Sequence, residues 1–184
     1  MLSKVFLGSL LAVAFAAPIA QNDEAGWQPA EGSVATCDKA SDKIISFTVG
    51  PQKEDVLNDA CAAMMPGCAY QERLASDVVC AQVLEWPLDG PKNSTQHANV
   101  EDATGNKLSG WNVQFSVTPA SQTEGSPGVF WTREECYGYF DQLVSKQEPD
   151  GCFNTVGSGV GSLKVGGSTS LKDTVFDIKI VKRA

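Results

Sequence analysis

The chain has 184 residues, of which 42% are hydrophobic and 20% are charged, and this composition suits one modest hydrophobic core in a single domain. Its 22 acidic and 14 basic residues give a formal net charge of −8. A general nucleic-acid-binding protein needs a positive surface to neutralise phosphates, so the composition argues against a nucleic-acid partner. The single histidine excludes sites that need two or more histidines.

The N-terminus has the pattern of a secretory signal peptide over residues 1–16. Lys4 supplies the positive charge, an apolar stretch covers residues 5–15, and small residues at positions 14, 16 and 17 form a cleavage pattern. We expect cleavage after Ala16, because Pro18 would directly follow a later cut. The stretch is shorter than the roughly 20 residues of a membrane span. We therefore expect a secreted protein without a membrane span, and a single N-terminal anchor is the alternative.

All six cysteines lie beyond the predicted signal, at Cys37, Cys61, Cys68, Cys80, Cys136 and Cys152. An even number in a secreted chain predicts three disulfides. Their spacing contains no C-x-x-C motif and only His97 could add a nitrogen ligand, so we expect no metal site. Proximity in the chain favours a Cys136–Cys152 disulfide. The other four cysteines would then pair with each other, for example Cys37 with Cys68 and Cys61 with Cys80.

The first half of the chain predicts a flexible arm over residues 17–40, followed by one domain over residues 41–184. Apolar and polar residues alternate over residues 45–49, which is typical of a half-buried strand. Residues 53–65 then carry apolar side chains at helical spacing, and Pro66-Gly67 ends this helix. The members of the apolar stripe are Leu57, Ala60, Cys61 and Met64.

A β-type run follows over residues 78–88, and its Pro87 indicates an edge or a bend. Residues 89–110 are rich in Gly, Asn, Ser and Thr, and predict a long loop. This loop contains His97 and the sequon Asn93-Ser94-Thr95. In a secreted protein such a sequon predicts an N-glycan on Asn93 at an exposed loop.

The second half opens with the clearest strand pattern of the chain, the alternation over residues 111–118. A second polar loop covers residues 120–128. Thr132 and Glu135 then have the spacing of a capping box, which predicts a helix that begins there and continues to Val144. Short strands are predicted at the end of the chain, over residues 163–165 and 176–180.

In chain order these elements read β-α-β-β-α-β with one further C-terminal strand, which is the ferredoxin-like order. We therefore predict an α+β fold: a disulfide-stapled, two-layer α/β sandwich in which two helices cover one face of an antiparallel sheet. An irregular α+β domain is the alternative.

Three features carry a resemblance to known proteins: the signal ending in Ala-Phe-Ala-Ala-Pro, the six cysteines, and the segment Gly128–Cys136 that leads to Gly151-Cys152. Together they resemble small secreted cysteine-rich proteins of filamentous fungi, a class that includes effector candidates. The predicted element order is similar to that of the killer-toxin-like effectors, which are disulfide-stapled α/β sandwiches. The resemblance implies secretion and action on a host, a competitor or a cell wall, and it implies no catalytic residues.

Candidate catalytic groups are few. His97 has a side chain suited to acid–base chemistry, but no Ser, Cys or carboxylate lies at an interpretable spacing, which favours an ordinary loop histidine. Glu134 and Glu135 are adjacent carboxylates, but neighbours on a helix point about 100° apart, and Glu135 fits the cap. The glycine-rich segment 157–161 lacks the Lys-Ser/Thr pair of a phosphate loop. We therefore predict no enzyme activity and no cofactor.

Tryptophans could form a sugar-stacking surface, although most tryptophans are core residues. Trp111 and Trp131 border the two polar loops, so with His97 they mark the expected binding surface on residues 89–110 and 120–128. The chain also ends with a dibasic pair, Lys182-Arg183, which is typical of a processing site. Charged residues that protect a strand end are the alternative interpretation.

These features predict a monomeric, effector-like protein that binds an unknown protein or glycan target outside the cell. A killer-toxin-like antifungal or cytotoxic protein is one alternative, and an extracellular protein that binds or acts on polysaccharide is another. A protease inhibitor would need a rigid loop held by disulfides, and the cysteine-free loop over residues 89–110 argues against it.

Overall fold

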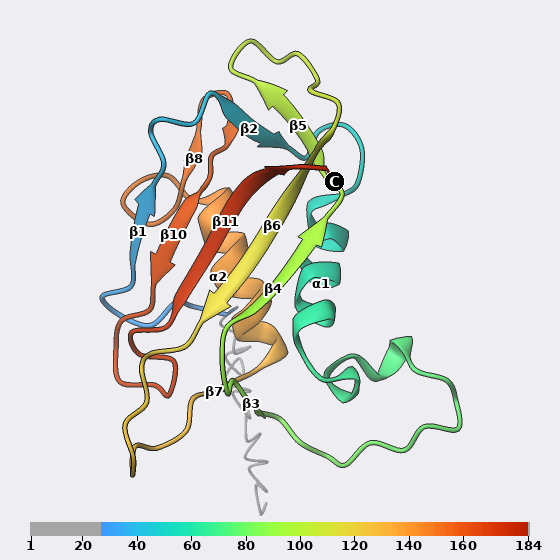
Figure 1. Ribbon diagram of the computed structural model, residues 1–184, viewed down its shortest axis with the longest axis vertical. Helices are drawn as coiled ribbons and strands as arrows, with labels where there is room; N and C mark the ends of the chain where they lie inside the picture. The colour runs from blue at the N-terminus through green and yellow to red at the C-terminus, as the bar shows by residue number, and fades with distance from the viewer. Residues whose placement is uncertain (1–26, 184) are drawn as a thin grey trace, which may run out of the picture.

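The computed structural model describes residues 27–183, so the predicted signal peptide and its cleavage site lie outside the described residues. The fold is mixed α/β with antiparallel sheets (Figure 1). The helices are α1 (Lys53–Met64), the 3₁₀ helix η1 (Gly67–Arg73) and α2 (Arg133–Ser145). The strands are β1 (Val34–Cys37), β2 (Lys43–Ser46), β3 (Trp86–Pro87), β4 (Lys92–Gln96), β5 (Asn99–Asp102), β6 (Trp111–Thr118), β7 (Phe130–Trp131), β8 (Phe153–Asn154), β9 (Gly157–Ser158), β10 (Gly161–Lys164) and β11 (Val175–Lys182).

The main sheet has the strand order β1-β10-β11-β6-β4, and its strands pair antiparallel throughout. Strand β6 coincides with the prediction for residues 111–118, because its alternating pattern buries every second side chain. Val113, Phe115 and Val117 are all 0% exposed and form the centre of the core. On β11, Phe176 and Ile178 point to the same face and are also buried.

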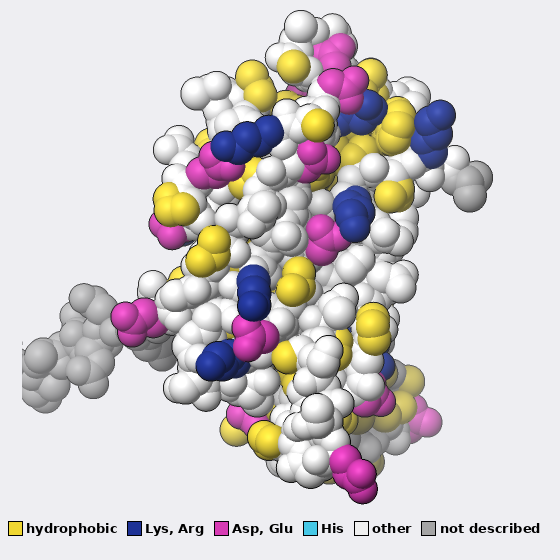
Figure 2. All heavy atoms as spheres, turned by 60° about the vertical axis from the view of Figure 1, so that its left-hand side comes forward, with side chains coloured by type: hydrophobic (Ala, Val, Ile, Leu, Met, Phe, Trp, Pro, Cys, Tyr) yellow, Lys and Arg dark blue, Asp and Glu magenta, His cyan; other side chains and the backbone are white. Residues whose placement is uncertain are grey.

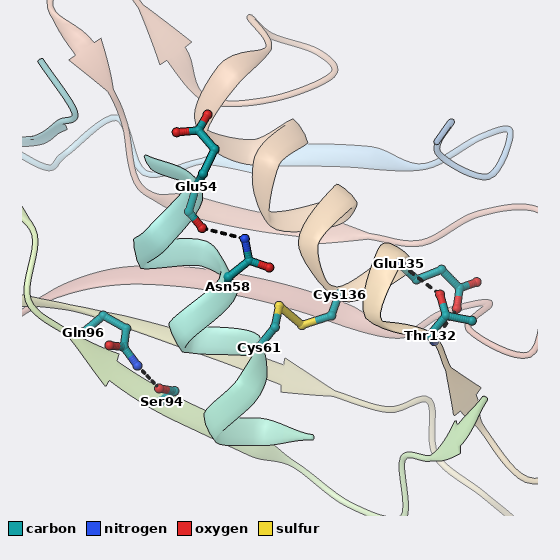
Figure 3. Close-up of a disulfide and its surroundings, with 8 residues drawn as sticks. All are labelled: Glu54, Asn58, Cys61, Ser94, Gln96, Thr132, Glu135 and Cys136. Carbon is teal, nitrogen blue, oxygen red and sulfur yellow. Dashed lines mark hydrogen bonds between the residues drawn. A yellow bond between two sulfur atoms is a disulfide. The ribbon is translucent and has the colours of Figure 1, made fainter. Parts of the chain in front are cut away.

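Both helices lie where the apolar patterns predict them: in Figure 1, α2 lies behind the main sheet and α1 lies beside β4. The predicted stripe of α1 is buried throughout. The capping box at the start of α2 is confirmed: the Thr132 hydroxyl accepts a hydrogen bond from the Glu135 amide at 3.0 Å, and Glu135 Oε2 accepts one from the Thr132 amide at 2.8 Å. The cap therefore fixes where α2 begins, as Figure 3 shows.

The strand order is not the ferredoxin-like one. Of the predicted strand over residues 45–49, only Ile45 and Ser46 are in a strand, β2, and β2 belongs to a second sheet with the order β5-β2-β9-β8. Of the predicted strand over residues 78–88, only Trp86–Pro87 pairs, with β7. The main sheet instead recruits β1 and β4 from the segments predicted as arm and loop. β4 reads Lys-Asn-Ser-Thr-Gln and has no apolar alternation, so its strand conformation depends on pairing with β6.

The predicted loose arm is in fact packed from Trp27 onward. The indole of Trp27 contacts Tyr139 edge to face, with ring centroids 4.8 Å apart. It also covers Gly138, where a Cβ atom would lie 2.2 Å from Trp27 Cδ2. Only a glycine at this position of α2 leaves room for the indole. This close contact between the indole and the helix is the reason why the segment from Trp27 onward is packed.

The three disulfides pair differently from the sequence-based expectation. They join Cys37 to Cys152, Cys61 to Cys136 and Cys68 to Cys80, so the predicted Cys136–Cys152, Cys37–Cys68 and Cys61–Cys80 disulfides are wrong. Proximity in the chain predicts the wrong pairs here because α1 and α2 pack side by side. Their inward-facing cysteines, Cys61 and Cys136, come within 6.0 Å between Cα atoms (Figure 3). Cys152 follows α2 and reaches the end of β1 instead.

The disulfides differ in how much each should stabilise the fold. In the chain-entropy model, the benefit grows with the length of the closed loop. Cys61–Cys136 spans 75 residues and lies in the core, whereas Cys68–Cys80 spans 12 residues at the periphery. We expect the double alanine variant of Cys61 and Cys136 to lose about 4–5 kcal/mol in the free energy of unfolding, and that of Cys68 and Cys80 about 3 kcal/mol. Urea denaturation measures both, and an equal or reversed order would contradict this ranking.

Candidate functional site

Four residues singled out in the sequence meet at one end of the main sheet. Trp111 begins β6 and Lys182 ends β11, and the two are register partners. Arg183 follows β11, and His97 follows β4 on the other side of β6. We call His97, Trp111, Lys182 and Arg183 the C-terminal corner, together with Lys43 from β2 and Asn112 from β6.

The indole of Trp111 is half-buried against the core and is contacted by two ammonium groups. Lys43 Nζ lies 4.7 Å and Lys182 Nζ lies 5.8 Å from the ring centroid. Both distances are within the range of a cation–π interaction. The ring therefore holds positive charge at the end of the sheet, and the two lysines lie over the ring that a sugar would need for stacking.

The guanidinium of Arg183 connects the other corner residues. Its Nη2 lies 2.8 Å from His97 Nδ1 and 3.4 Å from Asn112 Oδ1. Arginine only donates hydrogen bonds, so His97 Nδ1 is the acceptor in this contact. His97 is thus tied to a cation that cannot act as its proton acceptor or orienting carboxylate, an arrangement that suits binding better than acid–base catalysis.

In the described part of the chain, the two basic residues at the end of β11 have no acidic partner. Among residues 27–183, neither Lys182 nor Arg183 forms an ion pair with a carboxylate. Elsewhere basic and acidic side chains pair, and Figure 2 shows the two kinds side by side on one face. Asp42 pairs with Lys43, whose hydrogen bond and charge lower the pKa of that carboxyl. A positive corner therefore remains on a molecule of net charge −8.

A cavity of about 350 Å³ adjoins the corner. It lies between residues 38–43 and the last part of β11. Its lining residues are Asp38, Ala40, Ser41, Lys43, Trp111, Val160, Lys179, Ile180 and Val181. The cavity is thus lined by Lys179–Val181 of β11, by Trp111 and by Lys43.

The carboxylate of Asp102 closes the turn that follows β5. Asp102 Oδ1 accepts hydrogen bonds from the Thr104 amide at 2.9 Å, the Thr104 hydroxyl at 2.7 Å and the Asn106 amide at 3.0 Å. The hydroxyl of Thr104 and the donors of Asn106 lower the pKa of Asp102 well below its usual value. The Asp102 carboxylate thus accepts hydrogen bonds within its own turn and forms no ion pair with Lys43, its register partner on β2.

The predicted binding surface is only partly assembled. Trp131 is 1% exposed and lies in the core, so its predicted exposure is wrong; it packs there because β7 pairs with β3 beneath the sheet end. Of the first polar segment, only its start lies near the second: Lys92 pairs with Val117 close to the end of β6, after which residues 120–128 follow. Residues 103–110 precede β6 at its other end, and eight strand residues span about 26 Å. His97 and Trp111 lie at the same end of the sheet, joined through Arg183 and Asn112, whereas Trp131 is buried elsewhere.

Two other predicted positions can now be placed. Asn93 lies in β4, not in a loop, and its exposed side chain shares the uncovered face of the sheet with its register partner Ser116. Glycosylation there stays a prediction. Lys182 belongs to β11 and the Arg183 amide donates to Gly110 O at 2.8 Å, so the dibasic pair is held in the sheet.

A larger cavity of about 610 Å³ is lined by Lys53 and Ser145, which form a cluster with Asp141 between α1 and α2. Lys53 Nζ lies 2.7 Å from Asp141 Oδ1 and 3.0 Å from Ser145 Oγ, and the Ser145 hydroxyl donates to Asp141 at 2.9 Å. Burial lowers the pKa of Lys53, but the hydrogen bond and charge of Asp141 outweigh burial and raise it overall. A protonated lysine cannot activate Ser145, so this cluster joins two helices and is not a nucleophile–base pair.

Exposed aliphatic side chains form a second surface feature, on the segment between η1 and β3. Val79 is 94% and Leu84 is 83% exposed, with Val78 and Val83 beside them. The segment is tied down by Cys68–Cys80 at one end and by β3 at the other. The strand predicted over residues 78–88 is wrong for residues 78–85, because no partner strand pairs with them or covers them.

Within residues 27–183, no group of three or more His, Cys, Asp or Glu side chains is placed to hold a metal ion. Over the same residues, no helix combines the length and apolar composition that a membrane crossing requires. No family model, curated protein or solved structure matches this chain. The site is therefore interpreted from its own geometry.

The turn before β6 predicts a pH effect. A carboxyl whose pKa is lower in the folded chain stabilises the fold above its unfolded pKa, and this contribution disappears as the pH falls through the folded pKa. Thermal unfolding of the protein should therefore move to lower temperature as the pH drops below about 4. The Asp102→Asn variant should show a flatter decline, while Asp150→Asn, an exposed control, should follow the unchanged protein. Identical profiles for all three would contradict the role of Asp102.

Proposed function

We propose that this chain is a secreted, disulfide-stabilised protein that acts by binding an acidic extracellular target through the C-terminal corner. Three disulfides suit an oxidising compartment outside the cytosol. The predicted signal peptide and the resemblance to small cysteine-rich fungal proteins support the effector-like role. The target would then belong to a host, a competitor or a cell wall.

One observation carries the proposal: at one end of the sheet Lys182 lies over Trp111 and Arg183 lies beside His97 and Asn112, and neither cation has a carboxylate partner in the described residues of a molecule that is acidic overall. Unpaired cations at an exposed corner favour an anionic partner by charge complementarity. The net negative charge of the rest of the surface repels anions elsewhere, which would direct such a partner to this corner. Trp111 adds an apolar edge that water-exposed lysines alone would lack.

Polysaccharide binding by stacking on tryptophan remains the alternative, but the corner favours charge over stacking. Lys43 and Lys182 lie over the indole of Trp111, and Trp131 is buried. A neutral sugar would have to displace the lysines to reach the ring. A killer-toxin-like activity is compatible with the same corner and would appear as growth inhibition of a competitor by the pure protein.

Binding to three polymers tests the proposal: polyglutamate, polygalacturonate and a neutral β-glucan. We expect the mature protein to bind at least one acidic polymer at low salt and to release it at high salt, because exposed charges are screened. The double variant Lys182→Gln with Arg183→Gln should bind about tenfold more weakly, which corresponds to about 1.4 kcal/mol.

The matched control is the double variant Lys146→Gln with Lys172→Gln, which changes the net charge equally at exposed positions away from the corner. It should retain binding. Equal weakening by both double variants would show a general charge effect. Binding of the neutral β-glucan alone would refute the acidic target and favour the polysaccharide alternative.

A further inference from the structure

Strand β11 is longer than its neighbour on one side. β10 pairs with β11 from Val175 only as far as Ile178, where Gly161 is the last partner. On the other side, β6 pairs with β11 all the way to Lys182. The last four residues of β11, Lys179–Lys182, therefore pair with a strand on one side only, and β2 lies near β11 without pairing with it. We call their other side the free edge.

The hydrogen-bond pattern shows which backbone groups face the free edge. In an antiparallel pair, a residue directs its N–H and its C=O to the same neighbour, and successive residues alternate. The Arg183 amide donates to Gly110 O before β6, and the Val165 amide after β10 donates to Thr174 O. Odd-numbered residues of β11 thus bond toward β6 and even-numbered residues toward β10. Ile180 and Lys182 direct their backbone groups to the free edge.

The chain that could have paired with this edge turns away. The carbonyl of Val160 accepts from the Asp38 amide at 2.9 Å, and the Gly159 amide donates to Cys152 O at 2.9 Å. Both residues before β10 are thereby committed to other partners. Since Gly159 lies near the Cys37–Cys152 disulfide, this divergence is fixed by the covalent framework.

The cavity of about 350 Å³ described above lies along the free edge. Its lining includes Lys179 and Val181, whose side chains belong to the uncovered face, and also Ile180 and Trp111, which belong to the helix-covered face. A space lined from both faces lies beside the strand and not above it. It is therefore the place where an added strand would begin to pair.

The charges around the free edge indicate which kind of partner would bind there. Lys43, Lys179 and Lys182 surround it, and of these Lys43 pairs with Asp42 and Lys179 with Asp177 at 2.8 Å. Asp38 also lines the cavity, and its carboxylate accepts from the Ala40 amide at 3.0 Å. Lys182 and Arg183 form no ion pair with any carboxylate of residues 27–183. A second copy of this chain would bring the same lysines together, which disfavours self-pairing and favours an acidic segment.

We propose that the free edge of β11 accepts an extended acidic peptide segment of the extracellular target as an additional antiparallel strand. The peptide backbone would pair with the N–H and C=O groups of Ile180 and Lys182. Its carboxylates would face Lys182 and Arg183, and its other side chains would contact the indole edge of Trp111. This inference rests on the proposed function and names the partner as a polypeptide.

Residue-resolved amide hydrogen exchange tests the edge directly. In the free protein, the amides of Ile180 and Lys182 should exchange much faster than those of Lys179 and Val181, which bond toward β6. Slow exchange at Ile180 and Lys182 without any ligand would overturn the free edge itself.

The probe is a capped heptapeptide in which glutamate alternates with threonine. Its addition should slow exchange at Ile180 and Lys182 at least tenfold, while the amides of Lys179 and Val181 change little. A peptide of the same sequence with N-methyl groups on alternate residues keeps every charge and cannot pair as a strand. It should produce no protection, and equal protection by both peptides would overturn strand addition.

Charge variants complete the test. Lys182→Glu should abolish protection by the peptide, whereas Lys172→Glu, the matched control, should leave it unchanged. If acidic polymers bind the corner but the peptide protects neither edge amide, the proposed function stands and strand addition is wrong. Preference for polygalacturonate would show a glycan partner, and a dimer in sedimentation would show self-pairing. If no acidic probe binds at all, both proposals fail.

Discussion

The packing of α2 against β6 and β11, with α1 beside α2 and against β4, is the constraint on which the other features depend. Phe140 of α2 contacts Phe115 and Phe176 edge to face, with centroids 5.2 Å apart in both pairs, so one ring joins the helix to two central strands. The Cys61–Cys136 disulfide then fixes α1 beside α2. Because helix positions are set in this way, the residues before α1 and after α2 have to reach the sheet from fixed points. β2, which precedes α1, accordingly lies in a second sheet, and β10, which follows α2, pairs with β11.

The free edge of β11 follows from the same framework. After α2 the chain passes Cys152, which is bonded to Cys37 at the end of β1, and β10 starts only at Gly161. β11 returns alongside it but continues to Lys182, because β6 offers a longer partner. A strand edge without a neighbour exposes peptide groups that can pair with another chain. Here it lies next to cations without carboxylate partners in the described residues, and the two features together define the proposed site more narrowly than either alone.

Local sequence patterns predicted the elements whose stability is local. The capping box of Thr132 and Glu135, the buried stripe of α1 and the alternation of β6 all depend on residues within one or two turns or along one strand. The same patterns did not find β1 or β4, because these strands lack apolar alternation and are stabilised by pairing with β10 and β6. They also predicted a strand over residues 78–88. The aliphatic side chains of this segment suit a strand, but no sheet covers them.

For the candidate site, the sequence by itself determined the ingredients: an acidic chain, an even set of cysteines, and the chemistry of His97, Trp111, Lys182 and Arg183. Only the tertiary structure decided that these four residues meet, that Trp131 does not join them, and which cysteines bond. The physical reason is the range of the interactions. Caps and periodic patterns act between residues a few positions apart, whereas strand pairing and disulfide partners are set by which distant surfaces can bury one another.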